Sequence, residues 1–348
     1  MKRIYFVCNF YSGRADVNNN LPMILNKFTA AGYEVTIHPT QQPGDSIPFV
    51  RDACQSGNYD LIVCSGGDGT LNEVMQGYMQ AGATCPIGYI PFGTTNDFAR
   101  GLGIPEEPEQ AVNCIIHGEP RQCDVGQFND KYFTYVAAFG AFTDASYDTS
   151  QQAKNLLGHT AYILNGMTKL PKIRSCTMRV KYDGKVIEGD FLYGMITNAT
   201  SVGKLLSLTD VECDDGLFEM TLIRKPNTLL ELNQIVRALL KVQLGPERKY
   251  LHYLRAKDIT VTNLDTDPVP WTIDGEYAGE DKTNYIAIHR HAATFMVNPN
   301  AKKTEVGIAV VMPPKHEQQQ NDTMTQQNKS NTLNPENQDA PTPNVAYV

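Results

Sequence analysis

The sequence predicts an N-terminal α/β domain with a mostly parallel sheet, followed by a C-terminal β-sandwich domain. From residue 2 to about 125, apolar strand patterns alternate with helical patterns, which is typical of right-handed βαβ units. After Val125 the pattern changes to strands joined by turns such as Asp183-Gly184 and Asp274-Gly275. The chain has 348 residues, of which 41% are hydrophobic, so it is long enough for two packed cores.

The first half contains four strand candidates, each followed by a helix candidate. The strands are expected at RIYFVCN, YEVTIHP, LIVCS and PIGYIPF, and the helices near 17–32, 44–57, 70–81 and 106–117. A short helix is also expected to end at Leu102. In sheets of this kind, ligands bind beyond the carboxyl ends of the strands. The loops after these strands are therefore the first place to look for a site.

The second half is expected to be mostly strands. They are KYFTYVAAFGAF, SCTMRVKYDGKVIEGDFLYGMITNAT, LFEMTLI, KDITVTN, VPWTIDGEY and NYIAIHRHAATFMV, interrupted by helical patterns at 151–170 and 227–243. We predict a first domain at 1–125, completed by 296–312, and a second domain at 126–295. Residues 313–348 are rich in Gln, Asn, Pro, Ser and Thr, so a disordered tail is expected there.

Charge and composition exclude several classes of protein. The net charge of -8 argues against general nucleic-acid binding, which requires a basic domain. The sequence has neither a signal-peptide pattern nor a run of the ~20 apolar residues that a membrane span needs. The eight cysteines lie singly without a C-x-x-C pair, which favours buried reduced thiols over zinc sites or disulfides. We therefore expect a cytoplasmic protein.

The segment LIVCSGGDGTLNEV, residues 61–74, crosses from a buried strand into a helix through three glycines and one aspartate. Backbone N–H groups at a helix start lack intrahelical partners and suit a phosphate, and glycine lets an anion approach them closely. Asp68 does not fit a bare phosphate site, because its carboxylate would repel the phosphate unless a cation lay between them. The pattern thus indicates a phosphate site with a bound cation.

Two further loops are expected at the same edge of the sheet. The segment IPFGTTNDFAR follows the next strand with a glycine, two threonines and an aspartate, and VCNFYSGR ends the first strand. The candidate binding residues there are Asn9, Ser12, Gly13, Arg14, Gly93, Thr94, Asn96 and Asp97. Two such turns on adjacent strands are much more specific for a phosphate site than one. Arg14 is expected to neutralise phosphate charge.

These motifs resemble the diacylglycerol kinase catalytic-domain family, and within it the soluble bacterial lipid kinases. The resemblance covers roughly residues 2 to 300 and is carried by GGDGT at 66–70, PFGTTNDFAR at 91–100, CDVG at 123–126, DDGLFEM at 214–220 and DGE at 274–276. Two positions depart from the family pattern. Phe10 follows Asn9 where the family commonly has proline, and Thr209 stands where a proline is frequent before DDG.

The resemblance implies an ATP-dependent, Mg²⁺-requiring kinase that phosphorylates the hydroxyl of diacylglycerol, or of a related lipid alcohol, to give phosphatidic acid. It implies that Asp68 and Asp97 face the Mg²⁺, that Glu276 is the general base, and that Asp124 supports the same network. The residues implied to hold the ATP phosphates are Gly66, Gly67, Gly69 and Thr70, helped by Gly93, Thr94 and Asn96. An ordinary glutamate is a weak base for an alcohol, so its effect must come from alignment.

The acidic segment LTDVECDDGLFEM is a second candidate metal site. The resemblance suggests a structural Mg²⁺ bound by Asp215 and the Leu217 carbonyl, with Asp210 or Glu212 as a further ligand. Clustered carboxylates on a loop repel one another unless a cation or solvent intervenes, although a solvated charge run remains an alternative. Asp124 has an alternative too, as a capped residue at the domain junction.

The partners of the protein are less well specified by its sequence. Two segments, at 155–174 and 229–255, mix apolar and basic residues and are candidates for transient association with the inner face of an anionic membrane, where the lipid substrate lies. The alternative for both is ordinary core-packing helices. A homodimer is plausible for the family. Competing functions are an NAD kinase-like phosphotransferase, a non-catalytic nucleotide or lipid sensor, and an interaction scaffold that uses the polar tail.

Overall fold

The computed structural model describes residues 1–12, 17–140, 175–198, 201–202, 206–209, 214–228, 230–231, 235, 250–298 and 308–311. The chain divides into a unit at Met1–Val311 and a second at Met312–Val348, and every described residue belongs to the first. The predicted tail at 313–348, the helical pattern at 151–170 and most of the one at 227–243 lie outside the described residues.

The first part of the chain contains four parallel strands. They are β1 (Lys2–Cys8), β2 (Tyr33–Pro39), β3 (Leu61–Gly66) and β4 (Ile87–Pro91), and they lie in the order β4-β3-β1-β2. In register, Cys8 is opposite Ser65 and Gly66 is opposite Pro91. The carboxyl ends of β1, β3 and β4 are therefore level, and the loops that follow them meet at one edge of the sheet.

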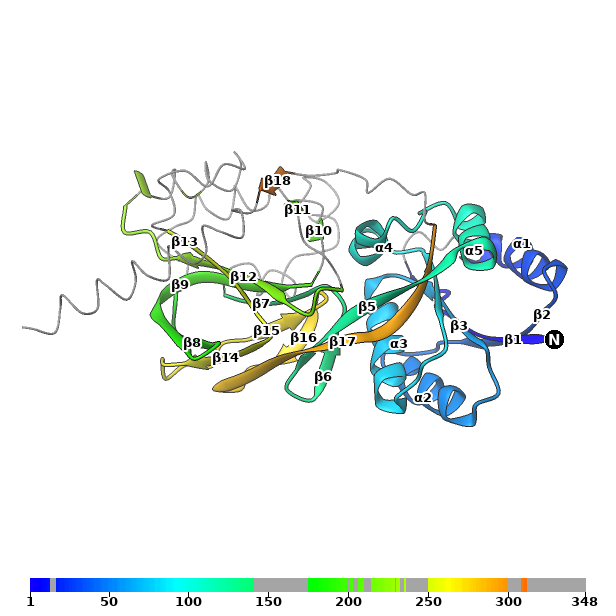
Figure 1. Ribbon diagram of the computed structural model, residues 1–348, viewed down its shortest axis with the longest axis horizontal. Helices are drawn as coiled ribbons and strands as arrows, with labels where there is room; N and C mark the ends of the chain where they lie inside the picture. Colours follow the sequence, from blue (N-terminus) through cyan, green and yellow to red (C-terminus); the bar gives the residue numbers. More distant parts are fainter. Residues whose placement is uncertain are drawn as a thin grey trace, which may run out of the picture. The chain divides into compact units, whose positions relative to one another are not determined.

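Among the described residues, five helices cover the two faces of this sheet. Alternate side chains of β1 point in opposite directions, so Ile4 and Phe6 pack with α1 (Val17–Ala30) and α5 (Pro108–His117). Tyr5 and Val7 pack with α2 (Ser46–Ser56), α3 (Asp68–Ala81) and α4 (Asp97–Leu102). Figure 1 shows α1 and α5 on one side of the strands and α2 and α3 on the other. The four longer helices agree with their predicted ranges to within two residues at each end.

The second part of the described chain consists of antiparallel strands. Their neighbour order is β16-β15-β7-β9-β8-β14-β17, with β12 paired to β9 and β13 to β12. These strands are β7 (Val136–Gly140), β8 (Cys176–Tyr182), β9 (Lys185–Thr197), β12 (Phe218–Arg224), β13 (Leu251–Ala256), β14 (Asp258–Asn263), β15 (Trp271–Ile273), β16 (Glu276–Gly279) and β17 (Thr283–Val297). A separate small sheet joins β10 (Ser201–Val202), β11 (Leu206–Thr209) and β18 (Ile308–Val311).

The aromatic core of this second part lies between the strands. Trp271, the only tryptophan in the chain, packs against Phe128 and Phe139 with ring centroids 5.0 and 4.7 Å apart. Both predicted Asp-Gly turns are present with positive φ at both residues, 44° and 74° at 183–184 and 48° and 86° at 274–275. These are the values expected for tight hairpin turns. The predicted fold class, an α/β part followed by a β-sandwich, is therefore confirmed.

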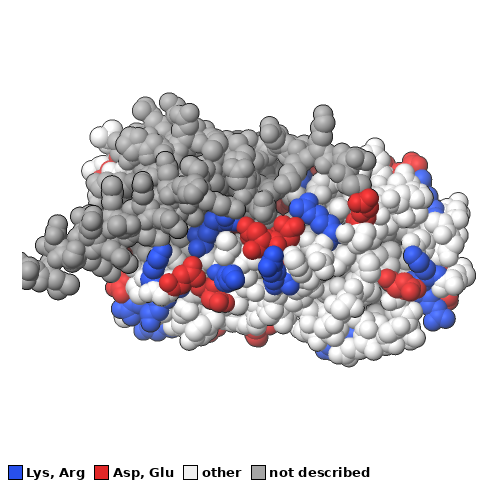
Figure 2. Space-filling model, viewed as in Figure 1, with Lys and Arg blue, Asp and Glu red and all other residues white. Residues whose placement is uncertain are grey.

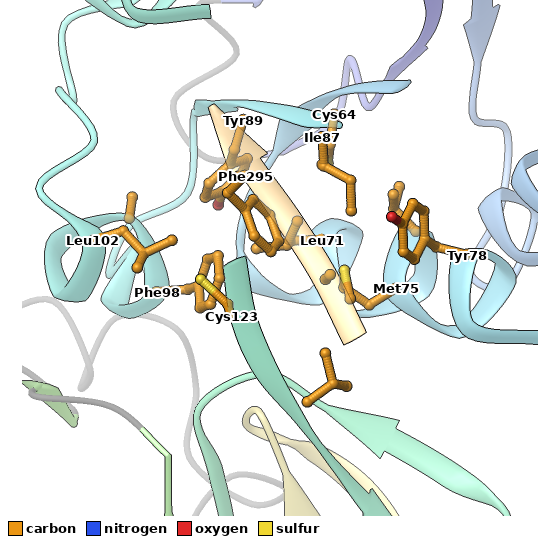
Figure 3. Packing of buried hydrophobic residues seen from close by; sticks show 14 of the residues in the cluster. Cys64, Leu71, Met75, Tyr78, Ile87, Tyr89, Phe98, Leu102, Cys123 and Phe295 are labelled. Carbon is orange, nitrogen blue, oxygen red and sulfur yellow. The ribbon is translucent and has the colours of Figure 1, made fainter. Parts of the chain in front are cut away.

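Two long strands connect the two parts. The first, β5 (Glu119–Phe128), continues into β6 (Lys131–Phe133) through a hairpin and pairs antiparallel with β17 along most of its length. At one end of β17, Phe295 pairs with Ile87 of β4 and packs against Phe98 of α4, with ring centroids 4.7 Å apart. In Figure 3 this ring lies close to Leu71 of α3 and Cys123 of β5.

The other ends of β5 and β17 belong to the second core. Phe128 and Ile286, near those ends, are buried there. The predicted boundary at Val125 thus falls inside a strand that both cores share. At the end of the described chain, β18 pairs with β11 rather than with the strands of the first part. The domain limits stay a prediction.

The described surface carries charges of both signs. On the face drawn in Figure 2, Lys and Arg side chains alternate with Asp and Glu, without an extended field of one sign over the described atoms. In the part of the chain that the structure describes, no helix has the length and apolar composition needed to traverse a lipid bilayer. Seven of the eight cysteines are described, and all seven are free thiols.

Candidate active site

The two glycine turns meet at the carboxyl edge of the parallel sheet. Gly67 is the N-cap of α3, and Gly93 follows β4. A Cβ atom built on Gly93 would lie only 2.7 Å from the Cα atom of Gly67 and 3.6 Å from the backbone nitrogen of Asp68. The backbones therefore approach so closely that neither turn has room for a side chain at this point. The first N–H groups of α3 thus face an edge that a second glycine turn borders.

The loop after β1 is fixed to the same helix. Asn9 donates a hydrogen bond from Nδ2 to Oγ1 of Thr70 at 3.0 Å, and its own Oδ1 accepts from the backbone N–H of Tyr11 at 2.9 Å. The Ser12 hydroxyl donates to the Asn9 carbonyl at 2.9 Å. Asn9, Ser12 and Thr70, which the sequence places in one site, are therefore linked in the structure. Gly13 and Arg14 lie outside the described residues.

The turn at 93–96 is closed by its own asparagine. Oδ1 of Asn96 accepts from the backbone N–H of Gly93 at 2.9 Å, and Nδ2 donates to the Gly93 carbonyl at the same distance. Asn96 is buried and has a φ of 52°, in the left-handed region that asparagine tolerates better than most residues. Both Asn96 and the Gly93 N–H are thus used to shape the turn. Thr94, at the tip of the turn, is exposed.

Asp68, the first residue of α3, carries a buried and incompletely bonded carboxylate. Its Oδ2 accepts from the backbone N–H of Asp97 at 3.3 Å, whereas its Oδ1 is buried without a hydrogen-bond partner among the described residues. Burial, and secondly repulsion from the Asp97 carboxylate, raise the pKa of Asp68 from 3.8 to about 7. Asp97 is itself 3% exposed. Two acids thus share one small space at this edge.

A divalent cation fits this pair of acids. A buried carboxylate oxygen without a donor is costly, and two neighbouring carboxylates repel each other unless positive charge lies between them. Carboxylate oxygens are the ligands that Mg²⁺ prefers, usually together with waters and phosphate oxygens. Asp68 and Asp97 therefore have the chemistry of a cation site beside the glycine turn at the start of α3.

Glu276 reaches this region from the second part of the chain. It is exposed and begins β16, directly after the tight turn at Asp274 and Gly275. A Cβ atom built on Gly69 of α3 would lie 3.0 Å from Oε1 of Glu276. The carboxylate predicted to be the base is therefore in contact range of the first turn of the helix that carries Asp68. The structure thus brings together residues that are about 200 positions apart in the sequence.

The hairpin that carries Glu276 is held by Asp274. The Asp274 side chain is 3% exposed and accepts hydrogen bonds from Nδ2 of Asn72 at 2.9 Å and from the Thr134 backbone and hydroxyl at 2.7 and 3.0 Å. The backbone N–H groups of Tyr135 and Val136 donate to its other oxygen at 3.0 and 3.1 Å. Burial nonetheless raises the pKa of Asp274, and these donors oppose the shift.

Asn72, Gln76 and the Asp274 side chain are site residues that the sequence motifs do not reveal. Asp68, Asn72 and Gln76 are spaced four residues apart, so they lie along one face of α3. Gln76 donates to the Asn72 side chain at 3.1 Å and exchanges hydrogen bonds with the Tyr132 backbone at 2.5 and 2.9 Å. Three polar residues at a spacing of four, beside the apolar positions Leu71, Val74 and Met75 of the same helix, are the signal that could have identified them.

Asp124 is bonded to backbone groups, as in the alternative of a capped residue at the domain junction. Its side chain is 2% exposed, with Oδ2 accepting from the Gly216 N–H and Oδ1 from the His291 N–H, both at 2.7 Å. His291 lies at the irregularity of β17 and has a φ of 52°. The Asp124 carboxylate thus holds a loop and a bulge in place, and its hydrogen bonds go to backbone groups rather than to Asp68 or Glu276.

Asp215, the expected ligand of a structural metal, is bonded to protein groups through both oxygens. Oδ1 accepts from the Leu217 N–H at 3.0 Å, and Oδ2 forms an ion pair with the Arg255 guanidinium. Arg255 also donates to Glu219 at 2.9 Å, and burial raises the pKa of Glu219 to about 8. Asp210 and Glu212 lie outside the described residues, among which no cluster of three or more acidic, histidine or cysteine side chains is suited to a metal. The described residues therefore do not by themselves form this second site.

Two family models together cover most of the chain. The diacylglycerol kinase catalytic domain matches residues 3–128, and the YegS C-terminal NAD kinase beta sandwich-like domain matches residues 137–300. The first match contains both glycine turns and Asp68, and the second contains Glu276 and the acidic segment. The two matched regions correspond to the α/β part and the β part described above.

Curated relatives and a solved structure agree with these matches. The chain is 34% identical to a diacylglycerol kinase of Bacillus subtilis, over 88% of this chain and 100% of the relative. It is 35% identical to one of Staphylococcus aureus, over 85% of this chain and 93% of the relative. The crystal structure of a diacylglycerol kinase from Bacillus anthracis superposes with a TM-score of 0.68 at 22% identity, over 86% of this chain and 98% of that one.

The predicted family is therefore confirmed, and with it the prediction of an enzyme. Kinases of this family use ATP as co-substrate and a lipid as acceptor, so the general functional prediction holds as well. The matches extend over both parts of the fold, including the motifs from which the resemblance was inferred. The chain belongs to the diacylglycerol kinase family and is a lipid kinase.

Proposed function

We propose that the enzyme transfers the γ-phosphoryl group of ATP to the free hydroxyl of diacylglycerol, giving phosphatidic acid and ADP. The observation that carries the proposal is the contact between Glu276 and Gly69, which brings a carboxylate from the β part next to the phosphate-facing turn of the α/β part. Phosphoryl transfer needs the accepting hydroxyl and the phosphate in one place, with little further chemistry from the protein.

The ATP phosphates would bind at the start of α3. The N–H groups there have the positive end of the helix dipole behind them, and Gly67 and Gly93 let the two turns pack backbone against backbone beside those groups. Thr70 and Asn9, already linked by a hydrogen bond, would fix the wall formed by the loop after β1. Arg14 would add positive charge to the same phosphates.

Asp68 and Asp97 would hold the Mg²⁺, with the unbonded Oδ1 of Asp68 as the first ligand. When bound, the ion would offset the charge of the transferred phosphoryl group and orient it. A second metal at Asp215 and the Leu217 carbonyl, with Asp210, would have to compete with Arg255, which already forms an ion pair with Asp215.

Glu276 would accept the proton of the lipid hydroxyl as the new P–O bond forms. Its exposed position suits an acceptor that arrives from outside, and its place after a rigid turn suits alignment. We further propose a first domain at 1–125 with 296–312, a lipid-binding domain at 126–295, a cytoplasmic location with transient binding to the inner face of the membrane, and a homodimer.

The acceptor is tested directly by presenting the purified enzyme with labelled ATP, Mg²⁺ and one candidate at a time. Mixed micelles containing diacylglycerol, a sphingoid base or ceramide are compared with NAD in the same buffer. We expect label in phosphatidic acid and none in NAD. Label in another lipid alcohol only would exclude diacylglycerol as the acceptor, and label in NAD only would overturn the lipid site itself.

The metal assignment is tested with Asp68→Asn, which keeps the shape of the side chain and removes its charge. Turnover should fall at least about 100-fold, because the loss of one ligand disturbs both charge compensation and alignment. Asp60→Asn, on an exposed loop before β3, is the matched control and should leave turnover unchanged. Normal turnover of Asp68→Asn at saturating Mg²⁺ would contradict the assignment.

A further inference from the structure

We infer that Asn72 is a positioning residue for catalysis: its hydrogen bond to Asp274 sets where Glu276 stands relative to the phosphate-facing end of α3. The inference rests on the proposed role of Glu276 as base and extends it to a group that touches neither substrate nor cofactor. It concerns the one face of α3 that carries Asp68, Asn72 and Gln76.

The helix α3 links the proposed cation site to the hairpin that carries Glu276. Asp68 and Asn72 are one helical turn apart on a rigid, buried helix, so their separation is fixed by the helix itself. Asn72 is 8% exposed, and its Nδ2 donates to Oδ2 of Asp274 at 2.9 Å and to the Tyr132 carbonyl at 3.1 Å. The helix α3, which begins at Asp68 in the proposed cation site, is therefore hydrogen-bonded directly to the hairpin that carries Glu276.

The hairpin that carries Glu276 is stiff. Asp274 and Gly275 adopt left-handed φ values of 48° and 86°, and the Asp274 N–H donates to the Val136 carbonyl at 2.8 Å. Glu276 comes only two residues after the anchored Asp274, so any shift of Asp274 moves the Glu276 backbone with it. The carboxylate at 276 is exposed and lies against Gly69, where a small displacement changes its distance to the reacting phosphate.

The hydrogen bond from Asn72 to Asp274 is distinct from the hydrogen bonds that stabilise the hairpin itself. Asp274 keeps four other donors when Asn72 is removed: the Thr134 N–H and hydroxyl and the N–H groups of Tyr135 and Val136. All four come from β7 and the segment before it, so they hold the hairpin within the β part. The bond from Asn72 comes from the α/β part, and it ties the hairpin directly to α3.

Gln76 completes the arrangement and fixes the Asn72 amide. Its Nε2 donates to Oδ1 of Asn72, which orients Nδ2 of Asn72 toward Asp274 and the Tyr132 carbonyl. Gln76 itself is 7% exposed and bonds to both the N–H and the carbonyl of Tyr132. Asn72 and Gln76, on successive turns of α3, thus form hydrogen bonds to the hairpin and to the segment before β7.

The test is a double-mutant cycle on kcat with Asn72→Ala and Glu276→Gln in the full-length enzyme, assayed with diacylglycerol micelles and saturating ATP. Gln80→Ala, on the same helix and exposed, is the matched control. We expect Asn72→Ala to lower kcat about 10- to 100-fold, because small misplacements of a reacting group cost this much, while the KM for ATP stays within about twofold. Gln80→Ala should behave as wild type.

The cycle distinguishes positioning from a structural role. If Asn72 acts through Glu276, Asn72→Ala should have little further effect once Glu276→Gln has slowed the enzyme. An equal fold-loss in both backgrounds would overturn the inference, as would an unchanged kcat of the single variant. A Glu276→Gln enzyme with wild-type kcat would instead overturn the proposed base. Thermal unfolding of each variant, followed through Trp271, ensures that only folded protein is compared.

Discussion

A methyl group on Gly93 would lie 2.7 Å from the Cα atom of Gly67, so the two glycine turns of the site touch through their backbones. Contacts this close are possible only when both residues lack a side chain. The turn at 93–96 is also fixed internally by the paired hydrogen bonds between Gly93 and Asn96. The surface that would receive the phosphates is therefore formed before any nucleotide arrives.

Gly93→Ala should disrupt this surface. The added methyl group must displace either Gly67 or the Asn96 side chain, at a cost of about 1–3 kcal/mol for overpacking. We expect the KM for ATP to rise and turnover to fall at least about tenfold. Gly189→Ala on β9 is the control, since its nearest atom would be at an ordinary 3.6 Å. Wild-type kinetics in Gly93→Ala would show that the two turns do not form the nucleotide surface.

Asp124→Ala should lower stability. It leaves the buried N–H group of Gly216 and the partly buried N–H group of His291 without acceptors, and each unsatisfied buried donor costs about 1–3 kcal/mol. Urea unfolding followed by Trp271 fluorescence should therefore show a loss of about 2–5 kcal/mol. Asp130→Ala, at an exposed turn in the same region, should change the unfolding free energy by less than about 0.5 kcal/mol. An unchanged midpoint for Asp124→Ala would contradict the structural role described here.

His252 should make stability depend on pH. Burial, and secondly the Arg224 guanidinium, lower its pKa from 6.5 to about 4, and its Nε2 accepts from Nε of Arg224 at 2.6 Å. Between these values the unfolded chain binds a proton and the folded chain does not, so unfolding becomes easier as pH falls. From pH 7.5 to pH 5 the contribution of His252 alone should fall by about 1–2 kcal/mol, while acids with a raised pKa such as Glu219 act in the opposite direction.

His252→Gln isolates this contribution, because glutamine can accept a hydrogen bond from Arg224 and does not titrate. Urea unfolding at the two pH values should show that acidification lowers the unfolding free energy of the wild type relative to that of the variant by this amount. An equal change in the two proteins would mean that His252 binds protons alike in the folded and unfolded states.

Local patterns predicted much of the fold, because the helices and strands of the α/β part follow the apolar periodicity of their own residues. The strand β17 was predicted almost in full at 284–297, whereas β5 was not predicted. One end of each strand lies in each core, and the two strands are far apart in the sequence, so their pairing was not foreseen. Val125 consequently marks a change of pattern without marking a break in the chain.

The candidate site likewise contains residues that local sequence patterns reveal and residues whose roles depend on distant partners. Glycines and aspartates near the strand ends identify themselves through their local chemistry, as for Asp68 and Gly93. Asn72 and Asp274 do not, because a buried amide and a turn carboxylate acquire their roles only when α3 and the hairpin meet across 202 residues. The roles of Asp124 and Asp215 likewise depended on partners that the sequence does not bring near, namely His291 and Arg255.

The most direct measurement of the central claim is the single-turnover rate of phosphoryl transfer in Glu276→Gln, with ATP binding measured on the same protein. If acids from the two parts converge on one reaction, transfer to diacylglycerol should slow at least about 100-fold while ATP affinity stays within about twofold. A transfer rate equal to wild type, or a loss of ATP binding that accounts for the whole effect, would contradict it.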